Sequence, residues 1–194
     1  MATTVFVAGS MHIKLLDAKV KERVEKIVNS HFAIVVGDAE GADRSIQALL
    51  FELGATNTTV YCSGAVPRNN VGNWPIHSVT THHTEGSRAF FTAKDIVMAD
   101  VADYGLMIWD AKSTGTLSNV IELLKRKKKS VVFVNKDKSF INVTSVPQLE
   151  ELVTRMSRHA KEKAEEKIHL TKQIDLLKHE QVVMFAKTRG AAKP

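Results

Sequence analysis

Three short segments of the 194-residue sequence combine small residues with hydroxyl or carboxylate side chains. They are residues 9–10 (Gly-Ser), residues 37–44 (Gly-Asp-Ala-Glu-Gly-Ala-Asp-Arg) and residues 110–116 (Asp-Ala-Lys-Ser-Thr-Gly-Thr). Small residues leave backbone N–H groups open to an approaching anion, and hydroxyl groups add hydrogen bonds to phosphate oxygens. These segments therefore favour the binding of a phosphate-bearing small molecule.

The candidate ligand-contacting residues are the small, hydroxyl-bearing and acidic positions of these segments. They are Gly9, Ser10, Gly37, Asp38, Gly41, Asp43, Asp110, Ser113, Thr114, Gly115 and Thr116. A plainer interpretation of the third segment is that Ser113 or Thr114 caps a helix and that Gly115 forms a tight turn. The occurrence of three such segments in one chain favours the anion site.

Alternating strands and helices are predicted to position these segments. Apolar runs predict strands at residues 3–8, 32–36, 58–62, 105–109 and 131–134, with a further short strand at 76–79. Helical spacing predicts helices at residues 15–28, 41–53, 88–99 and 117–126. Apolar strands separated by helices predict a mainly parallel sheet covered on both faces, in a doubly wound, Rossmann-like α/β fold. In the usual winding, the three segments meet beyond the carboxyl ends of the strands.

The sequence changes character after residue 136, the predicted end of the Rossmann-like domain (residues 1–136). Residues 145–189 predict a helical extension in the form of one long amphipathic helix. Its apolar positions at helical spacing are Leu149, Val153, Met156, Ala160, Ala164, Ile168 and Thr171. Such a stripe must be buried, either against the Rossmann-like domain or against a second subunit, and we expect a homo-oligomer that uses this helix.

The composition is that expected of a cytoplasmic protein with a sizeable core, since 44% of the residues are hydrophobic and no run is long enough to span a membrane. The single cysteine, Cys62, excludes a disulfide within the chain. The formal net charge is +6, and residues 125–129 (Lys-Arg-Lys-Lys-Lys) carry most of the excess. This run is typical of a solvated helix end, and a nucleic-acid contact is the alternative.

Histidines at positions 77, 82 and 83, with Glu85 nearby, are the residue types that suggest a metal ion. Adjacent histidines rarely point at one ion, and the sequence contains no second cluster with ligand spacing. We therefore expect these histidines to lie in a surface loop, and we expect no metal site and no cofactor.

Three segments carry a resemblance to a known superfamily. Residues 35–43 (Val-Val-Gly-Asp-Ala-Glu-Gly-Ala-Asp) are similar to a Gly-Gly-Ala-x-Gly-Ala-Asp loop, with Asp38 in place of the second Gly. Residues 94–98 (Lys-Asp-Ile-Val-Met), followed by Ala102-Asp103, are similar to an Arg-x-x-x-Met…Ala-Asp segment, and residues 109–116 to a Trp-Asp-Gly-x-Ser-x-Gly-Thr loop. The chain thereby resembles the SLOG superfamily, which contains the DprA/Smf proteins and the lonely-guy phosphoribohydrolases. Within it, the nearest likeness is to the YspA-like proteins.

The resemblance implies a nucleotide-derived ligand whose phosphate is held by residues 113–116, with Lys94 at the position of a family Arg. Some relatives cleave the N-glycosidic bond between base and ribose, and these enzymes have a Glu about one helical turn after the Gly-Thr pair. Leu117, Ser118 and Asn119 occupy that stretch here, and Glu122 lies almost one turn further on.

These residues lead to three alternative functions. The first is a module that binds or senses a nucleotide or nucleotide derivative. The second is a nucleotide N-glycosidase, resembling a phosphoribohydrolase or a deoxyribosyltransferase, whose carboxylate stabilises an oxocarbenium-like sugar. Its catalytic candidates are Asp38, Glu40, Asp95 and Glu122. The third is DNA-associated work like that of DprA, which would draw on residues 125–129 and would depend steeply on salt.

Overall fold

The computed structural model of the chain describes the backbone of residues 2–190 and the side chains of residues 2–180. Its strands are β1 (Thr4–Gly9), β2 (Ala33–Gly37), β3 (Thr58–Ser63), β4 (Ile76–Val79), β5 (Tyr104–Trp109), β6 (Lys129–Val134) and β7 (Ser139–Val143). Its helices are α1 (Ala18–Asn29), α2 (Ala42–Glu52), α3 (Arg88–Val101), α4 (Thr114–Lys125), α5 (Val146–Thr154), α6 (Arg158–Ile168) and α7 (Leu170–Gly190).

The strands form one sheet in the order β4-β3-β2-β1-β5-β6-β7. Every neighbouring pair from β4 to β6 is parallel, and β7 runs antiparallel to β6. The chain order changes direction between β1 and β5, which is the switch point of a doubly wound sheet. The predicted α/β fold is therefore confirmed, and the short strand expected at residues 76–79 is β4.

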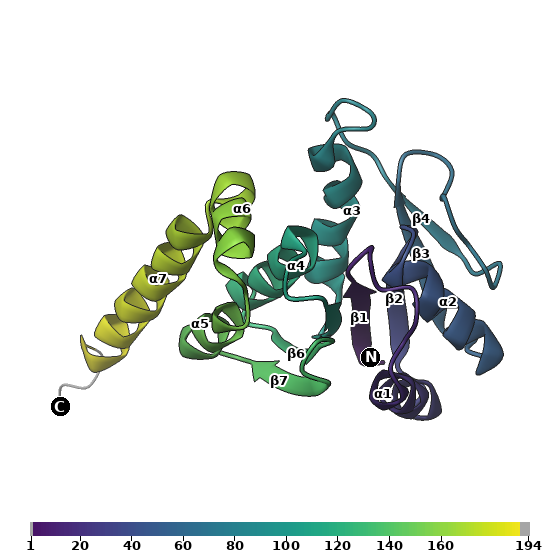
Figure 1. Ribbon diagram of the computed structural model, residues 1–194, viewed down its shortest axis with the longest axis horizontal. Coiled ribbons are helices and arrows are strands. Elements are labelled where there is room, and N and C mark those ends of the chain that lie inside the picture. The colour runs from purple at the N-terminus through teal and green to yellow at the C-terminus, as the bar shows by residue number, and fades with distance from the viewer. Residues whose placement is uncertain (1, 191–194) are drawn as a thin grey trace.

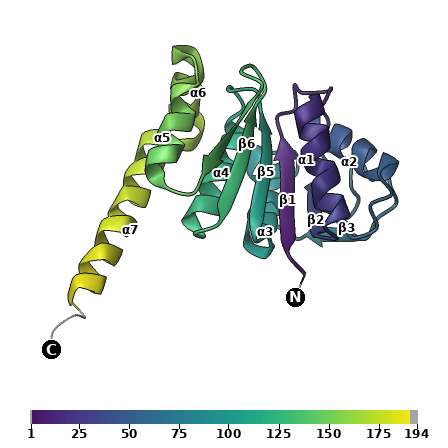
Figure 2. The ribbon, with the colours of Figure 1, turned by 90° about the horizontal axis from the view of Figure 1, so that it is seen from below.

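The parallel strands are buried on both faces because alternate side chains point to opposite sides of the sheet. In β1, Val5 and Val7 belong to the hydrophobic cluster formed with α1 and α2, whereas Phe6 and Ala8 belong to the cluster formed with α3 and α4. Figures 1 and 2 show the helices arranged around the sheet in this way. This two-sided burial explains why the strands are apolar throughout in the sequence.

The antiparallel strand β7 was not predicted. Its residues alternate in exposure, with Ile141 and Val143 buried and Asn142 exposed, because β7 lies at the edge of the sheet. Such a short polar-apolar alternation lacks the continuous apolar run that marked the other strands. The sheet therefore continues past residue 136, and the division into domains at 1–136 and 145–189 stays a prediction.

The C-terminal extension is helical, as expected, but it consists of α5, α6 and α7 rather than one continuous helix over residues 145–189. Ser157 begins α6, and its Oγ accepts a hydrogen bond from the N–H of Ala160 at 3.2 Å. His169 ends α6 with a left-handed φ of 50°, and the side chain of Glu165 accepts hydrogen bonds from the backbone and hydroxyl of Thr171. These local caps supply hydrogen-bond partners to backbone groups where one helix ends and the next begins. No Gly or Pro marks these positions in the sequence.

The apolar stripe of the extension packs against the chain's own sheet domain. Leu149, Met156, Ala160 and Ala164 are buried in the same hydrophobic cluster as α3, α4 and one face of the sheet. Helix α5 packs on β7 and α6 packs on α4, which places the extension at the β7 end of the sheet, away from α2 (Figures 1 and 2). The stripe thus needs no second subunit to cover it, and the expected oligomer stays a prediction.

Within residues 2–190, no helix combines the length and the apolar character needed to cross a lipid bilayer.

Candidate functional site

The segments that follow β1 and β5 meet at the switch point, as predicted. Gly9 and Ile108 are paired in neighbouring strands, and the N–H of Ser10 donates to the carbonyl of Ile108 at 2.9 Å. Ser10 is completely buried, and its Oγ lies 3.2 Å from Oγ1 of Thr116. The same Oγ accepts a hydrogen bond from the N–H of Asp110 at 3.1 Å. One hydroxyl group thus joins the β1 loop to both ends of the residue 110–116 segment.

Part of the residue 110–116 segment is bonded within itself. Oδ1 of Asp110 accepts from the N–H groups of Lys112 (2.9 Å) and Ser113 (2.7 Å). Ser113 is the N-cap of α4, and its Oγ accepts from the N–H of Thr116 at 3.3 Å. The plainer interpretation of Ser113 as a helix cap is therefore confirmed, and these amides already have partners inside the chain.

Gly115 differs from the other glycines of the candidate site. A Cβ added there would meet no atom closer than Oγ of Ser113, at 3.9 Å, so the space beside the first turn of α4 is open. A glycine inside a helix costs about 1 kcal/mol relative to alanine, and neither internal packing nor a positive φ requires one here. Ser113 caps the N–H of Thr116. By contrast, the N–H groups of Thr114 and Gly115 form no hydrogen bond within the described residues, so this open face can receive an anion.

Gly9 and Gly41 serve the packing of the β1 segment against α2. A Cβ at Gly9 would lie 2.7 Å from Cβ of Ala42, and one at Gly41 would lie 2.0 Å from the carbonyl oxygen of Met11. Gly41 also has a φ of 78°, a conformation that glycine adopts without the Cβ strain of other residues. The close approach that these two glycines allow is therefore between parts of the chain itself.

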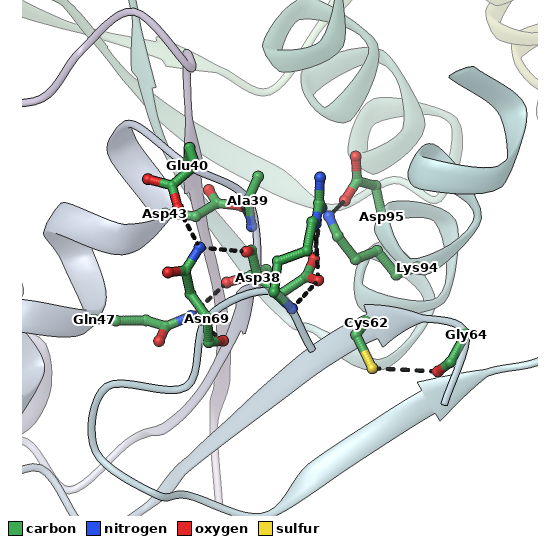
Figure 3. A network of polar contacts seen from close by, with 12 residues as sticks. Asp38, Ala39, Glu40, Asp43, Gln47, Cys62, Gly64, Asn69, Lys94 and Asp95 are labelled. Atoms are coloured by element: carbon green, nitrogen blue, oxygen red, sulfur yellow. Dashed lines mark hydrogen bonds and ion pairs between the residues drawn. The ribbon is translucent and has the colours of Figure 1, made fainter. Parts of the chain in front are cut away.

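Gly37 lies against the charged side chains of Lys94 and Asp43, and Figure 3 shows these two with Asp95. Nζ of Lys94 is 2.6 Å from Oδ1 of Asp95, and the Lys94 side chain is 4% exposed. A Cβ at Gly37 would lie 2.9 Å from Nζ of Lys94 and 2.4 Å from Oδ2 of Asp43. The space that the absent side chain of Gly37 leaves is thus occupied by Lys94 and Asp43.

The pKa values of Asp43 and Lys94 are both raised, for different reasons. Desolvation by burial raises the pKa of Asp43 to about 6, and its Oδ1 has no hydrogen-bond partner among the described residues. Burial disfavours the ammonium of Lys94, but the carboxylates of Asp95 and Asp43 outweigh burial and raise the pKa of Lys94. Lys94 therefore stays charged, and the pKa of Asp43 lies at about 6.

Asp38 pairs with Arg68, which comes from the loop between β3 and β4. Nη2 and Nε of Arg68 donate to the two carboxylate oxygens at 2.7 and 3.0 Å, and the Arg68 guanidinium lies 4.6 Å from the ring centre of Phe91. Burial opposes ionisation, but the hydrogen bonds from Arg68 outweigh it and hold the pKa of Asp38 below its ordinary value. The signal for this partner was the acidic residue Asp38 directly after an apolar strand, because a buried carboxylate requires a cation.

The catalytic candidates Glu40 and Glu122 lie apart. Glu40 is exposed, and it accepts hydrogen bonds from Asn69 at 3.1 Å and from Arg44 at 3.4 Å. Glu122, in the third turn of α4, pairs with Lys125 at 2.8 Å and with Arg126 at 2.6 Å. Asn69 also donates to the backbone carbonyl of Asp38 at 2.9 Å, so Glu40 lies near Asp38, but it does not line the cavity that Asp95 and Glu122 share.

Asp95 and Glu122 do line one cavity of about 320 Å³ between α3, α4 and the α6–α7 connection. Its walls are formed by Arg88, Thr92, Asp95, Ile96, Ser118, Asn119, Ile121, Glu122, Ile168, His169 and Gln173. Sequence reasoning missed the last three residues as site residues, because nothing local indicated that the extension turns back onto α4.

The basic run lies where α4 ends and β6 begins, at the amino end of this parallel strand rather than at the carboxyl ends of the strands. Lys125 and Arg126 pair with Glu122, and Arg126 also pairs with Asp100. Nζ of Lys128 donates to the carbonyls of Ala99 and Asp100. These contacts favour the helix-end interpretation of residues 125–129, although three of the five side chains are bonded to neighbouring groups rather than only solvated.

No protein-family model matches the sequence, and no curated protein matches it. Solved structures share its fold. DNA processing protein A from Helicobacter pylori, described for its single-stranded DNA binding mode, is 20% identical with a TM-score of 0.51, over 67% of this chain and 64% of that one. DNA processing protein A from Streptococcus pneumoniae is 18% identical with a TM-score of 0.51, over 68% of this chain and 50% of that one.

A molybdenum cofactor carrier protein from Chlamydomonas reinhardtii has a TM-score of 0.48 and 18% identity, over 68% of this chain and 76% of that one. At these identities the likenesses concern the fold. The chain is a Rossmann-like α/β protein. More particularly, its fold is similar to that of the DNA processing protein A structures, and this chain spans less than two thirds of their length.

Proposed function

We propose that the chain binds a nucleotide or nucleotide derivative at the carboxyl ends of its parallel strands, as a ligand-binding or sensor module of the SLOG type. The observation that carries this proposal is the open face at Gly115, beside which the β1 loop is held by the Ser10–Thr116 contact. A phosphate at this face would meet the positive end of the α4 dipole. The SLOG assignment and the YspA-like likeness rest on the sequence segments described above.

The arrangement of charges supports a binding role over catalysis. Asp95 is paired with Lys94, and Glu122 is paired with Lys125 and Arg126. A general acid for glycosidic cleavage needs a raised pKa. The carboxyl group of Asp43 has a raised pKa, but Asp43 is 5% exposed and lies behind Gly37.

An N-glycosidase is retained as the second candidate because Asp95 and Glu122 line the same cavity. The two candidates are distinguished by one experiment with the full chain. Thermal-shift and calorimetric titrations with AMP, CMP, GMP, UMP, NAD and ADP-ribose are followed by chromatography of each mixture. We expect at least one compound to raise the melting temperature while remaining intact. Release of free base would instead establish the enzyme, and the absence of binding by all six would reject the nucleotide site.

The DNA-associated alternative has a separate test. A fluorescent single-stranded oligonucleotide is titrated with the chain at several salt concentrations and its anisotropy is recorded. We expect weak binding, because three of the five residues in the basic run are bonded to neighbouring groups. Tight binding that weakens steeply with salt would favour a DNA-binding role.

A further inference from the structure

The cavity between α3 and α4 is closed on one side by the C-terminal extension. Ile168, His169 and Gln173 come from the connection between α6 and α7, which we call the elbow (residues 168–173). A volume of about 320 Å³ falls at the lower end of the range typical of small-molecule sites. The extension thus supplies a wall of a cavity whose other walls belong to the sheet domain.

The elbow is held in place by its own hydrogen bonds. The N–H of His169 donates to the carbonyl of Glu165 at 3.0 Å, and Oε2 of Glu165 accepts from the N–H of Thr171 at 2.9 Å and its hydroxyl at 2.8 Å. The left-handed φ of His169 then turns the chain into α7. The wall of the cavity is therefore preformed, which lowers the entropic cost of binding a ligand.

Two side-chain amides at this cavity lack hydrogen bonds to the described residues. Oε1 of Gln173 is fully buried without a partner. Asn119 is 6% exposed and lines the same cavity, and its side chain forms no hydrogen bond within residues 2–180. A buried acceptor without a donor destabilises the free protein, so a ligand that supplies an N–H or O–H group is favoured.

The other walls favour a flat and uncharged group. Ile96, Ile121 and Ile168 provide apolar surface. The carboxylates of Asp95 and Glu122 already have cationic partners, so the cavity has little excess charge to attract a cation. Apolar walls with two free amides suit a heterocyclic base, whose edge carries both donors and acceptors.

The cavity lies one helical turn from the open face at Gly115. Asn119 follows Gly115 by four residues in α4, a rise of roughly 6 Å. A ligand with its phosphate beside Gly115 could therefore extend its base toward Asn119. Arg88 lines the cavity as well and forms no ion pair within the described part of the chain, so its guanidinium is available to the ligand.

Resting on the function proposed above, we propose that the elbow is part of the nucleotide site and that Gln173 recognises the base through an N–H group. The chemical class of ligand is then a nucleoside phosphate, and the extension is a specificity element.

The test compares Gln173→Met with Lys172→Met in the full chain. Methionine keeps the approximate length of glutamine without its hydrogen-bonding groups, and Lys172 is an exposed neighbour in the same helix. Binding of AMP, CMP, GMP, UMP and ribose 5-phosphate is measured by calorimetry, and the melting temperature by thermal unfolding. Ribose 5-phosphate carries the sugar and phosphate without a base.

In Gln173→Met we expect the affinity for the nucleotide that binds best to fall at least about fivefold, with ribose 5-phosphate unaffected. The melting temperature should stay the same or rise, because a buried acceptor without a partner is removed. Lys172→Met should match the wild type. Unchanged nucleotide affinity in Gln173→Met would overturn the assignment of Gln173 to the base and leave the proposed function standing. The same holds if the affinity for ribose 5-phosphate falls as much as that for the nucleotide and the melting temperature also falls. No binding to the wild type would reject the proposed function itself, and the base assignment with it.

Discussion

Oγ of Ser10 and Oγ1 of Thr116 lie 3.2 Å apart although 106 residues separate them in the chain. This buried contact joins the loop after β1 to the first turn of α4, across the switch point of the sheet. It fixes where the open face at Gly115 lies relative to the β1 loop.

Removing the Ser10 hydroxyl should therefore destabilise the protein more than removing that of Thr116. In Ser10→Ala the partly buried N–H of Asp110 loses its acceptor, and we expect a loss of roughly 1–3 kcal/mol in the free energy of unfolding. Thr116→Val keeps the shape of the side chain and should cost about 1 kcal/mol. Urea denaturation measures both values, and a double mutant measures their coupling. A larger loss for Thr116→Val would contradict the central role of Ser10.

Replacing Gly115 by leucine should separate ligand binding from stability. Leucine is a better helix former than glycine by roughly 0.8 kcal/mol, and the space at Gly115 is open, so the melting temperature should not fall. The new side chain would cover the first turn of α4, and we expect nucleotide affinity to drop at least about tenfold. Lys161→Leu, at an exposed position of α6, is the control. Undiminished affinity in Gly115→Leu would remove the main support for a phosphate at this turn.

Asp43 should make stability depend on pH between about 4 and 6. Its folded pKa of about 6 lies above the ordinary value of 3.8, so the folded chain binds more protons than the unfolded chain in this range. Its contribution to stability is therefore present at low pH and is lost as the pH rises through about 6. Asp43→Asn resembles the protonated form and should lack this loss. We therefore expect the free energy of unfolding of Asp43→Asn, measured relative to that of the wild type, to rise by about 1–3 kcal/mol between pH 4 and pH 7.

Chemical denaturation at several pH values measures this difference. A difference between Asp43→Asn and wild type that stays constant from pH 4 to pH 7, or that moves against the variant, would show that Asp43 titrates in its ordinary range.

Arg68 should matter more for stability than its partial exposure suggests. Arg68→Met leaves the carboxylate of Asp38, which is 2% exposed, without its guanidinium partner. We expect the free energy of unfolding to fall by about 2 kcal/mol at pH 7. This is less than the cost of breaking a fully buried ion pair, because the Arg68 side chain is 37% exposed. Asp38→Asn should cost less, since it leaves no buried charge. The deficit of Arg68→Met should shrink as the pH falls below 3.8, the ordinary pKa of Asp, because the stabilisation from the lowered pKa of Asp38 is lost there. A deficit that does not depend on pH would point to lost packing on Phe91 instead.

The sequence by itself determined the sheet and the region of the candidate site. Continuous apolar runs between amphipathic helices predict parallel strands buried on both faces, because neither face of such a strand carries polar side chains that could contact solvent. The order of the elements then placed the segments after β1 and β5 side by side. Ser113 was also readable as a helix cap, since a serine directly before a helix satisfies one of its free amides.

Tertiary structure alone decided which groups occupy the space between these segments. Gly37 was expected to leave room for a ligand, but Lys94 arrives there from α3 and pairs with Asp95. Likewise, the turn at His169 directs α7 so that Gln173 lines the cavity beside α4. Sequence patterns report what each element buries, whereas the partner of a buried charge or amide depends on contacts between residues far apart in the chain.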